Sequence, residues 1–301
     1  MKLGVIVPQG WTGEYDSWEP SRAWQRTVEV AQQADGLGVD SIWLFDHFHT
    51  VPKPTDELTF ESFTSLAALA ALTDRVRLGH IVICNGFRNP ALTAKMASTL
   101  DTISEGRFEL GIGAGWKKDE WLAYGYGFPE TRERLAMLHD ALEVITRMLV
   151  PGRTAHATFD GEHHQVDDAR NVPKPIQTIG MPIMVGGNGP KVTWRLAARY
   201  ADELNLDGTS PDEVREALPV IRARCEEIGR DPDSLDVSVH IWWGTNAWRT
   251  AGSARQRLLA EYAELGLSRV MGLLRASADD DEAVDGLVKD ARAAGIELTG
   301  A

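Results

Sequence analysis

The sequence has little that suggests a nucleic-acid or membrane partner. Its 301 residues carry a formal net charge of −13 and contain no Lys/Arg run, whereas binding to nucleic acid or to an anionic membrane favours a basic patch. No apolar stretch approaches the roughly 18 residues of a membrane-spanning helix. The N-terminal stretch has too short an apolar run for a signal peptide and no small-residue cleavage site. We therefore expect a cytoplasmic protein that acts on a small-molecule substrate.

Cysteine and metal-binding patterns are equally scarce. The chain has two cysteines, Cys84 and Cys225, which are too few for a disulfide framework and compatible with a reducing compartment. It has no H-x-x-x-H pattern and no cysteine pair, so the sequence predicts no metal site. The G-x-S-x-G motif of serine hydrolases is also missing.

Apolar strand-like segments alternate with helical segments eight times along the chain. We expect strands at residues 3–7, 41–45, 76–84, 108–112, 182–185, 203–206, 235–243 and 268–274, and helices at residues 20–37, 60–72, 90–103, 130–149, 190–200, 211–228, 254–265 and 282–294. This alternation predicts an α/β fold of parallel strands with right-handed crossovers. Eight units in 301 residues favour one closed (β/α)8 TIM barrel over residues 1–301, with an open doubly wound sheet as the alternative.

One segment departs from the alternation. Asp160 and Gly161 lie between two short β-like runs, which is the composition of a β-hairpin turn. The sequence therefore predicts a hairpin-containing insertion at about residues 152–180, between the fourth helix and the fifth strand.

The ends of the predicted strands bring polar and glycine-rich residues together. In a barrel of this type the active site lies at the C-terminal ends of the strands. The residues at these ends are Gln9, Asp46, His47, Cys84, Asn85, Ala114, Gly115, Trp116, Gly186, Gly187, Asn188, Gly189, Asp207, Trp242, Trp243 and Arg275. We expect these residues to line one opening, or mouth, at the C-terminal end of the barrel.

Two glycine-rich stretches in this set have alternative explanations. Gly111, Gly113 and Gly115 follow each other at every second position, but Trp116 stands where a dinucleotide fingerprint requires glycine. The stretch is either a strand end narrowed by packing or the floor beneath a flat ligand. Residues 186–189, placed before a helix with Pro190 in its first turn, predict an anion site. A plain strand-to-helix turn is the alternative.

His47 and the tryptophans are the other candidates. A histidine exchanges a proton near neutral pH, and the neighbouring Asp46 can tune it. A structural histidine that bonds across the mouth fits the sequence equally well. Trp116, Trp242 and Trp243 predict a flat aromatic lining for a planar or apolar substrate, although tryptophan is also a common core residue.

Together these motifs resemble the luciferase-like flavin and deazaflavin oxidoreductase family. The similar stretches run in order along the chain, at residues 43–48, 87–91, 94–101, 104–116, 161–164, 182–187 and 197–203. The Gly113–Trp116 sequence, followed by Glu120, is more similar to the branch that uses coenzyme F420. The resemblance implies a bacterial-luciferase-like barrel, often dimeric, with the cofactor ring lying across the mouth.

The resemblance also implies roles for individual residues. It makes His47 the proton donor, with Asp46 beside it, and it places a non-prolyl cis peptide at Ile81–Val82 behind the ring. The implied cofactor-binding residues are Asp46, Ile81, Val82, Cys84, Ala114, Gly115, Gly186, Gly187, Asn188 and Gly189, and the substrate pocket contains Trp11, Trp116 and Trp242. Sugar-phosphate dehydrogenases of the family carry a catalytic glutamate where Trp116 stands, so their activity is not expected here.

The resulting hypothesis is an oxidoreductase that transfers a hydride between coenzyme F420 and an unidentified organic substrate. One alternative is an FMN-dependent monooxygenase that uses reduced flavin and O₂. A second alternative is a catalytically silent flavin-binding or deazaflavin-binding protein. We also expect a homodimer and a reductase that supplies reduced cofactor.

Overall fold

The computed structural model describes residues 1–149, 156–242 and 246–298. Its parallel strands are β1 (Lys2–Ile6), β2 (Ser41–Leu44), β3 (Arg77–His80), β4 (Ile83–Cys84), β5 (Phe108–Gly113), β8 (Ile183–Gly186), β9 (Glu203–Asp207), β10 (Asp236–Ile241) and β11 (Arg269–Leu273). The helices are α1 (Pro20–Gly36), α2 (Ser62–Leu72), α3 (Pro90–Ile103), α4 (Lys118–Ala123), α5 (Thr131–Leu149), α6 (Thr193–Tyr200), α7 (Pro211–Glu226), α8 (Asn246–Arg249), α9 (Ser253–Glu264) and α10 (Ala283–Ala293).

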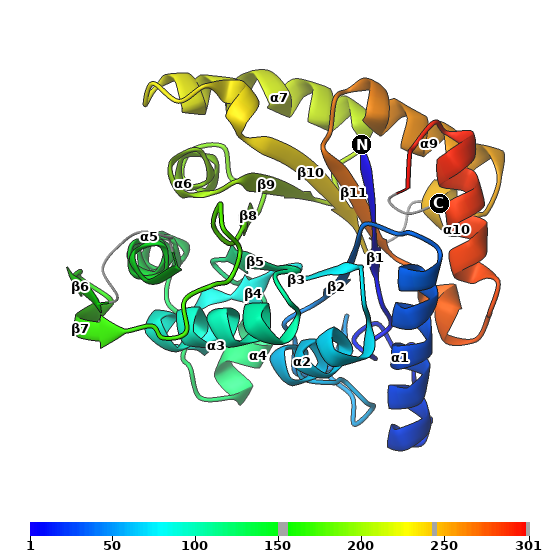
Figure 1. The fold of residues 1–301 in the computed structure, drawn as a ribbon, viewed down its shortest axis with the longest axis horizontal. Helices are drawn as coiled ribbons and strands as arrows, with labels where there is room; N and C mark the ends of the chain where they lie inside the picture. Colours follow the sequence, from blue (N-terminus) through cyan, green and yellow to red (C-terminus); the bar gives the residue numbers. More distant parts are fainter. Residues whose placement is uncertain (150–155, 243–245, 299–301) are drawn as a thin grey trace.

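The strands close into a barrel, which confirms the predicted (β/α)8 fold and excludes the open sheet. The strand order is β3-β2-β1-β11-β10-β9-β8-β5-β4. The ring is closed by β3 and β5, which pair in parallel through Leu78 with Phe108 and Gly79 with Glu109. Figure 1 shows the helices around this ring, with α1, α9 and α10 on one side and α3, α5 and α6 on the other.

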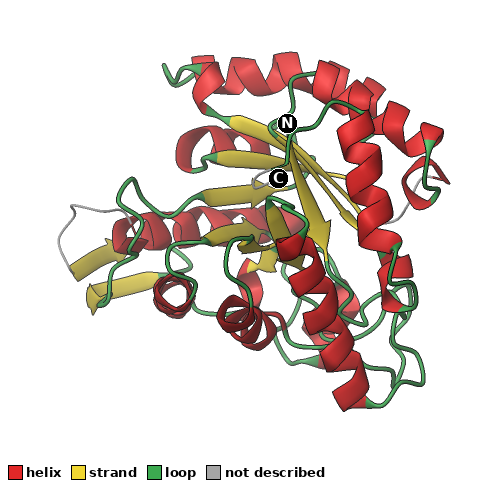
Figure 2. Ribbon diagram, turned by 45° about the vertical axis from the view of Figure 1, so that its right-hand side comes forward, coloured by secondary structure: helices red, strands yellow, loops and turns green. Residues whose placement is uncertain are grey.

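The predicted insertion is also present. Strands β6 (His156–Asp160) and β7 (Gln165–Arg170) form an antiparallel hairpin between α5 and β8. Figure 2 shows this hairpin at the periphery, outside the ring of barrel strands. The first part of the expected insertion, residues 152–155, lies outside the described residues.

Local sequence signals explain where several helices begin. The Glu61 side chain accepts hydrogen bonds from the backbone amides of Phe63 and Thr64 at the start of α2, and the Asn89 side chain accepts one from Ala91 at the start of α3. These bonds satisfy amides that have no partner inside a helix. The helices that follow β2 and β4 are thereby fixed at their N-terminal ends, next to the mouth.

Two hydrophobic clusters hold the barrel together. The larger one lies between the strands and the surrounding helices. The smaller one fills the barrel and includes Ile6, Trp43, Phe45, Met184 and Met271. Over the described residues, no helix is long and apolar enough to cross a membrane.

Four of our predictions about individual elements differ from the structure. The strand expected over residues 76–84 is broken after His80 into β3 and β4. The helix expected from Pro190 begins at Thr193. The segment after Trp116, for which no helix was expected, contains helix α4. The strand expected to end at Trp243 ends at Ile241, and Trp243 lies outside the described residues.

Candidate active site

Most of the predicted strand ends meet at one cavity of about 390 Å3 at the C-terminal mouth of the barrel. Gln9, Asn85 and Arg275 do not line it, and Trp243 lies outside the described residues. Every candidate that the sequence placed in a catalytic, cofactor or substrate role lines it. These residues are Trp11, Asp46, His47, Ile81, Val82, Cys84, Ala114, Gly115, Trp116, Gly186, Gly187, Asn188, Gly189 and Trp242. The fold therefore brings together residues that are spread over more than two hundred positions of the chain.

The break between β3 and β4 forms the floor of this cavity. The Ile81–Val82 peptide bond is cis, as the resemblance implied. A Cβ atom added to Gly113 or Gly186 would lie 2.8 or 2.9 Å from a methyl carbon of Val82, which is too close for an ordinary contact. Packing around Val82 thus explains these glycines. Since Val82 is half-buried and lines the cavity, the same packing presents an apolar surface to a ligand.

The Asp46 carboxylate holds in place the chain segments that carry the cavity floor. Its carboxylate accepts hydrogen bonds from both terminal nitrogens of Arg88, at 2.7 and 2.9 Å, from the Ser62 hydroxyl at 2.9 Å, and from the Cys84 backbone amide at 2.9 Å. Burial would raise the pKa of Asp46, but the neighbouring Arg88 guanidinium outweighs it and holds this pKa below its ordinary value. The network ties the end of β2 to β4 and α2, and it occupies both carboxylate oxygens.

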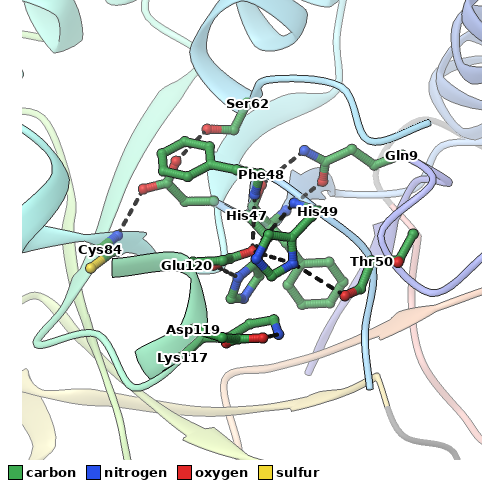
Figure 3. Close-up of polar contacts among 12 residues, drawn as sticks. Gln9, His47, Phe48, His49, Thr50, Ser62, Cys84, Lys117, Asp119 and Glu120 are labelled. Carbon is green, nitrogen blue, oxygen red and sulfur yellow. Dashed lines mark hydrogen bonds and ion pairs between the residues drawn. The ribbon is translucent and has the colours of Figure 1, made fainter. Parts of the chain in front are cut away.

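Helix α4 brings a second carboxylate to His47. The buried Glu120 side chain lies 2.6 Å from His47 Nδ1 and accepts hydrogen bonds from the backbone amides of Phe48, at 3.0 Å, and His49, at 3.4 Å. In Figure 3 Glu120 lies against the side chains of His47 and His49. With Nδ1 facing Glu120, Nε2 is the ring nitrogen that remains for exchange with a molecule in the cavity.

Sequence reasoning gave Glu120 no role because the helix that carries it was not predicted. One signal was present, since Asp119 and Glu120 are acidic residues in the first turn of α4, where helices favour them. Their position directly after the Trp116 strand end also placed them near the mouth.

Tryptophans enclose the other faces of His47. The Trp11 ring stacks on the His47 ring with centroids 4.1 Å apart and planes within 1°. Trp116 meets the His47 ring edge-on at 5.9 Å, and Trp242 lies 4.8 Å from Trp11. Trp11 is buried, whereas Trp116 is 57% exposed. The wall around His47 is therefore aromatic, with Trp116 at its open rim.

The glycine loop opposite this wall differs from the expected anion site. Because α6 begins at Thr193, Pro190 is not in its first turn. The Asn188 side chain bonds at 2.9 Å to both the amide and the carbonyl of the Asp207 backbone. Asn188 thus joins the end of β8 to the end of β9, and the loop lines the cavity as a backbone surface.

A second histidine at the mouth was also missed. His240 Nδ1 lies 2.5 Å from Asn205 Oδ1, and its Nε2 lies 3.2 Å from Asp207 Oδ1. Trp242 Nε1 donates to the same Asp207 oxygen at 2.8 Å. Burial would raise the pKa of Asp207, but the His240 and Trp242 contacts outweigh it and lower this pKa. Strand alternation was the available signal, because His240 precedes Trp242 by two residues and shares its face.

A closed eight-fold barrel with a ligand-sized cavity at its C-terminal mouth belongs to the TIM-barrel class. The family model described as "Luciferase-like monooxygenase" matches residues 1–294. The chain is a member of this family, as the sequence motifs indicated.

Individual relatives and structures agree with this assignment. An F420-dependent glucose-6-phosphate dehydrogenase of Kineococcus radiotolerans is 36% identical over 79% of this chain and 68% of its own. The pyrimidine monooxygenase RutA of Stutzerimonas stutzeri is 30% identical over 76% of this chain and 65% of its own. The structure of an F420-dependent secondary alcohol dehydrogenase, in complex with an F420–acetone adduct, superposes with a TM-score of 0.81 over 97% of this chain and 98% of its own, at 20% identity. At that identity it supports the fold alone.

Proposed function

We propose that this protein is an oxidoreductase that uses coenzyme F420 to oxidise or reduce an organic substrate. The observation that carries the proposal is the geometry of the mouth, where the His47–Glu120 pair faces the same cavity as the Val82 floor. The similarity to the F420-dependent dehydrogenase of Kineococcus supports the choice of cofactor.

The residues at the mouth fit a flat, anionic cofactor. The apolar Val82 surface suits a planar ring, and the backbone of residues 113–115 and 186–189 lines the cavity on either side of it. Arg134 supplies positive charge to the lining, and Lys117, which is paired with Asp119 at 2.8 Å, also lines it. Arg134 is held in place because its guanidinium donates to the backbone carbonyls of Gly115 and Pro129. We propose that these groups hold the ring and the phosphate of the cofactor.

The protein's part in the reaction would centre on His47. A bound deazaflavin would supply or accept the hydride. We propose that His47 Nε2 donates or accepts the matching proton at the substrate, while Glu120 fixes the tautomer and orientation of the ring. Asp46 is proposed as a positioning residue, because its oxygens accept bonds from Arg88, Ser62 and Cys84. The stacked Trp11 ring keeps water from one face of His47.

The substrate of the Kineococcus relative is not carried over to this chain. The exposed Trp116 indole stands where the resemblance places the catalytic glutamate of sugar-phosphate dehydrogenases. Since Trp116 forms the rim of an aromatic wall around His47, we propose a bulkier or more apolar substrate than a sugar.

A paired titration of the purified apo-protein with coenzyme F420 and with FMN tests the proposal. Cofactor fluorescence and tryptophan quenching report binding. We expect tight binding of F420 and weak binding of FMN. The reverse would favour the FMN-dependent monooxygenase, for which O₂ uptake with reduced flavin is the next measurement. Binding of neither cofactor would contradict both activities. The homodimer and the reductase partner stay proposals, and sedimentation of the F420-loaded protein tests the first.

A further inference from the structure

A second cavity, of about 470 Å3, lies behind the tryptophan wall. Its apolar surface comes from Trp242, Trp248 and Leu273, together with Val51 and Pro52. Trp248 is buried and donates its ring N–H to the Leu273 carbonyl at 3.0 Å, which fixes this surface to the end of β11. We call this space the arginine cavity, because its polar lining consists of Thr12, Arg249, Arg275 and Asp279.

The charges of the arginine cavity are not balanced by the protein. Arg249 and Arg275 are both exposed, and neither forms an ion pair within the described residues. Arg275 donates one hydrogen bond, at 3.2 Å, to the Gly13 carbonyl. Asp279 is the one carboxylate among the described lining residues, so the lining carries an excess positive charge. Arginine forks bind carboxylate and phosphate groups well, because two N–H donors match two acceptor oxygens.

The arginine cavity adjoins the candidate active site at Trp242. Trp242 lines both of them, and it also lines an outer cavity of about 910 Å3. The outer cavity shares Trp116 with the active site and shares Val51 and Pro52 with the arginine cavity. A molecule at His47 can thus extend around the Trp242 edge without entering the barrel core.

We propose that the substrate carries an anionic group, a carboxylate or a phosphate, which Arg249 and Arg275 bind while the reacting carbon lies beside His47. This inference rests on the proposed function, because it assigns the distal part of the same substrate. It narrows the substrate class to molecules with an apolar or aromatic body and one anionic end.

Isothermal titration calorimetry on the full chain, with and without coenzyme F420, tests the assignment. The probes are 3-phenylpropionate, 2-phenylethyl phosphate and the neutral 3-phenylpropionamide. We expect the better anion to bind at least about tenfold tighter than the amide, since charge-assisted bonds to arginine are the strong ones. The ranking of the two anions distinguishes carboxylate from phosphate. Added NaCl should weaken binding of the anions and leave the amide nearly unchanged.

Matched variants locate the site. Arg249→Gln and Arg275→Gln should each weaken anion binding roughly threefold to tenfold, and the double variant should bind the anion like the amide. Arg257→Gln removes an equally exposed charge from α9 and should change nothing. Equal binding of anion and amide, or an unchanged double variant, would overturn the proposal.

The fluorescence of bound F420 tests the link to the reaction centre. The anionic probes should change it in the wild type and not in the double variant. Anion binding that leaves this fluorescence unchanged would overturn the assignment to the substrate. If F420 itself does not bind, the proposed function fails, but the preference for the anion is still measurable on the cofactor-free chain. The two failures are thus distinguishable.

Discussion

The two ends of the barrel both contain buried charged residues, but they arrange them differently. At the N-terminal end, Arg269 donates to Glu109 at 2.8 and 3.3 Å and lies 3.6 Å from both Glu203 and Asp40. Arg77 forms a further ion pair with Glu109. This cluster lies at the starts of the strands, away from the mouth. These charged groups pair with one another, although Asp40 Oδ2, Glu203 Oε1 and Arg269 Nε form no hydrogen bond among the described residues.

At the C-terminal end, only part of the charge is satisfied in the same way. Asp46 and Arg88 form a closed bidentate pair, whereas the His47–Glu120 pair uses one ring nitrogen and faces a cavity. The difference separates charges that hold the barrel from charges that are available for chemistry. Substitutions at the two ends should therefore change different measured quantities.

The largest effect should come from His47→Asn. Removing a general acid–base group typically lowers turnover by roughly 10²–10⁴-fold. The variant should keep its F420 affinity within a few-fold and its unfolding midpoint near that of the wild type. Turnover is measured with the first substrate found. His163→Asn, in the peripheral hairpin, is the control. Wild-type turnover in His47→Asn would remove His47 from the mechanism.

Arg269→Met should change stability instead. It leaves Glu109 and Glu203 buried beside an apolar side chain, and breaking a buried ion pair in this way costs about 3–5 kcal/mol of unfolding free energy. Urea denaturation measures the loss, with the exposed Arg257→Met as control. F420 affinity of the folded fraction should stay unchanged. A weakened F420 affinity would show that the two ends are coupled.

Asp46→Asn tests the intermediate case of a closed ion pair at the mouth. The amide keeps the shape but loses the charged acceptor for Arg88, which costs about 1.5–3 kcal/mol. Because Asp46 also fixes the Cys84 amide, F420 should bind several-fold more weakly as the floor shifts. Asp279→Asn, at an exposed position outside the cofactor cavity, is the control. If Asp46→Asn lost stability but kept full F420 affinity, Asp46 would not be needed to position the cavity floor for the cofactor.

The sequence was sufficient to predict the barrel and many of the residues at its mouth. Alternation of eight strand and helix signals depends on local patterning, and the C-terminal ends of parallel strands must meet at one edge. This geometry is why Asp46, Gly186 and Trp242, far apart in the chain, line one cavity.

Details that depend on tertiary contacts were out of reach. Helix α4 has six residues, too few for a clear helical period, so the approach of Glu120 to His47 was not foreseen. The break at Ile81–Val82 lies in an uninterrupted apolar run and was indicated by the resemblance alone. The pairing of Asp46 with Arg88 joins residues 42 positions apart, and nothing in the local pattern selects that partner.

We expect the smallest effect from Glu203→Gln. This variant tests whether Glu203 is protonated or ionised in the buried cluster at the N-terminal end. Burial raises the pKa of Glu203, whereas at Glu109 the attraction of Arg269 outweighs burial and lowers the pKa. A carboxyl with a raised pKa keeps its proton in the folded chain after the unfolded chain has released it. The contribution of Glu203 to the free energy of unfolding is thus full below 4.5, the pKa of the group in the unfolded chain. It is lost as pH rises through the raised pKa that the group has in the folded chain. Between pH ~5 and ~8, wild-type stability should therefore fall by about 1–3 kcal/mol relative to Glu203→Gln.

Urea denaturation across this pH range measures the difference, and the exposed Glu226→Gln should follow the wild type. The opposite slope, with the wild type gaining on Glu203→Gln as pH rises, would mean that Glu203 is ionised beside Arg269. In that case Arg269 would pair with two ionised carboxylates, Glu109 and Glu203. The cluster at the N-terminal end would then carry one more negative charge than it does when Glu203 keeps its proton. The loss expected for Arg269→Met would then be larger, because two buried charges instead of one would lose their partner.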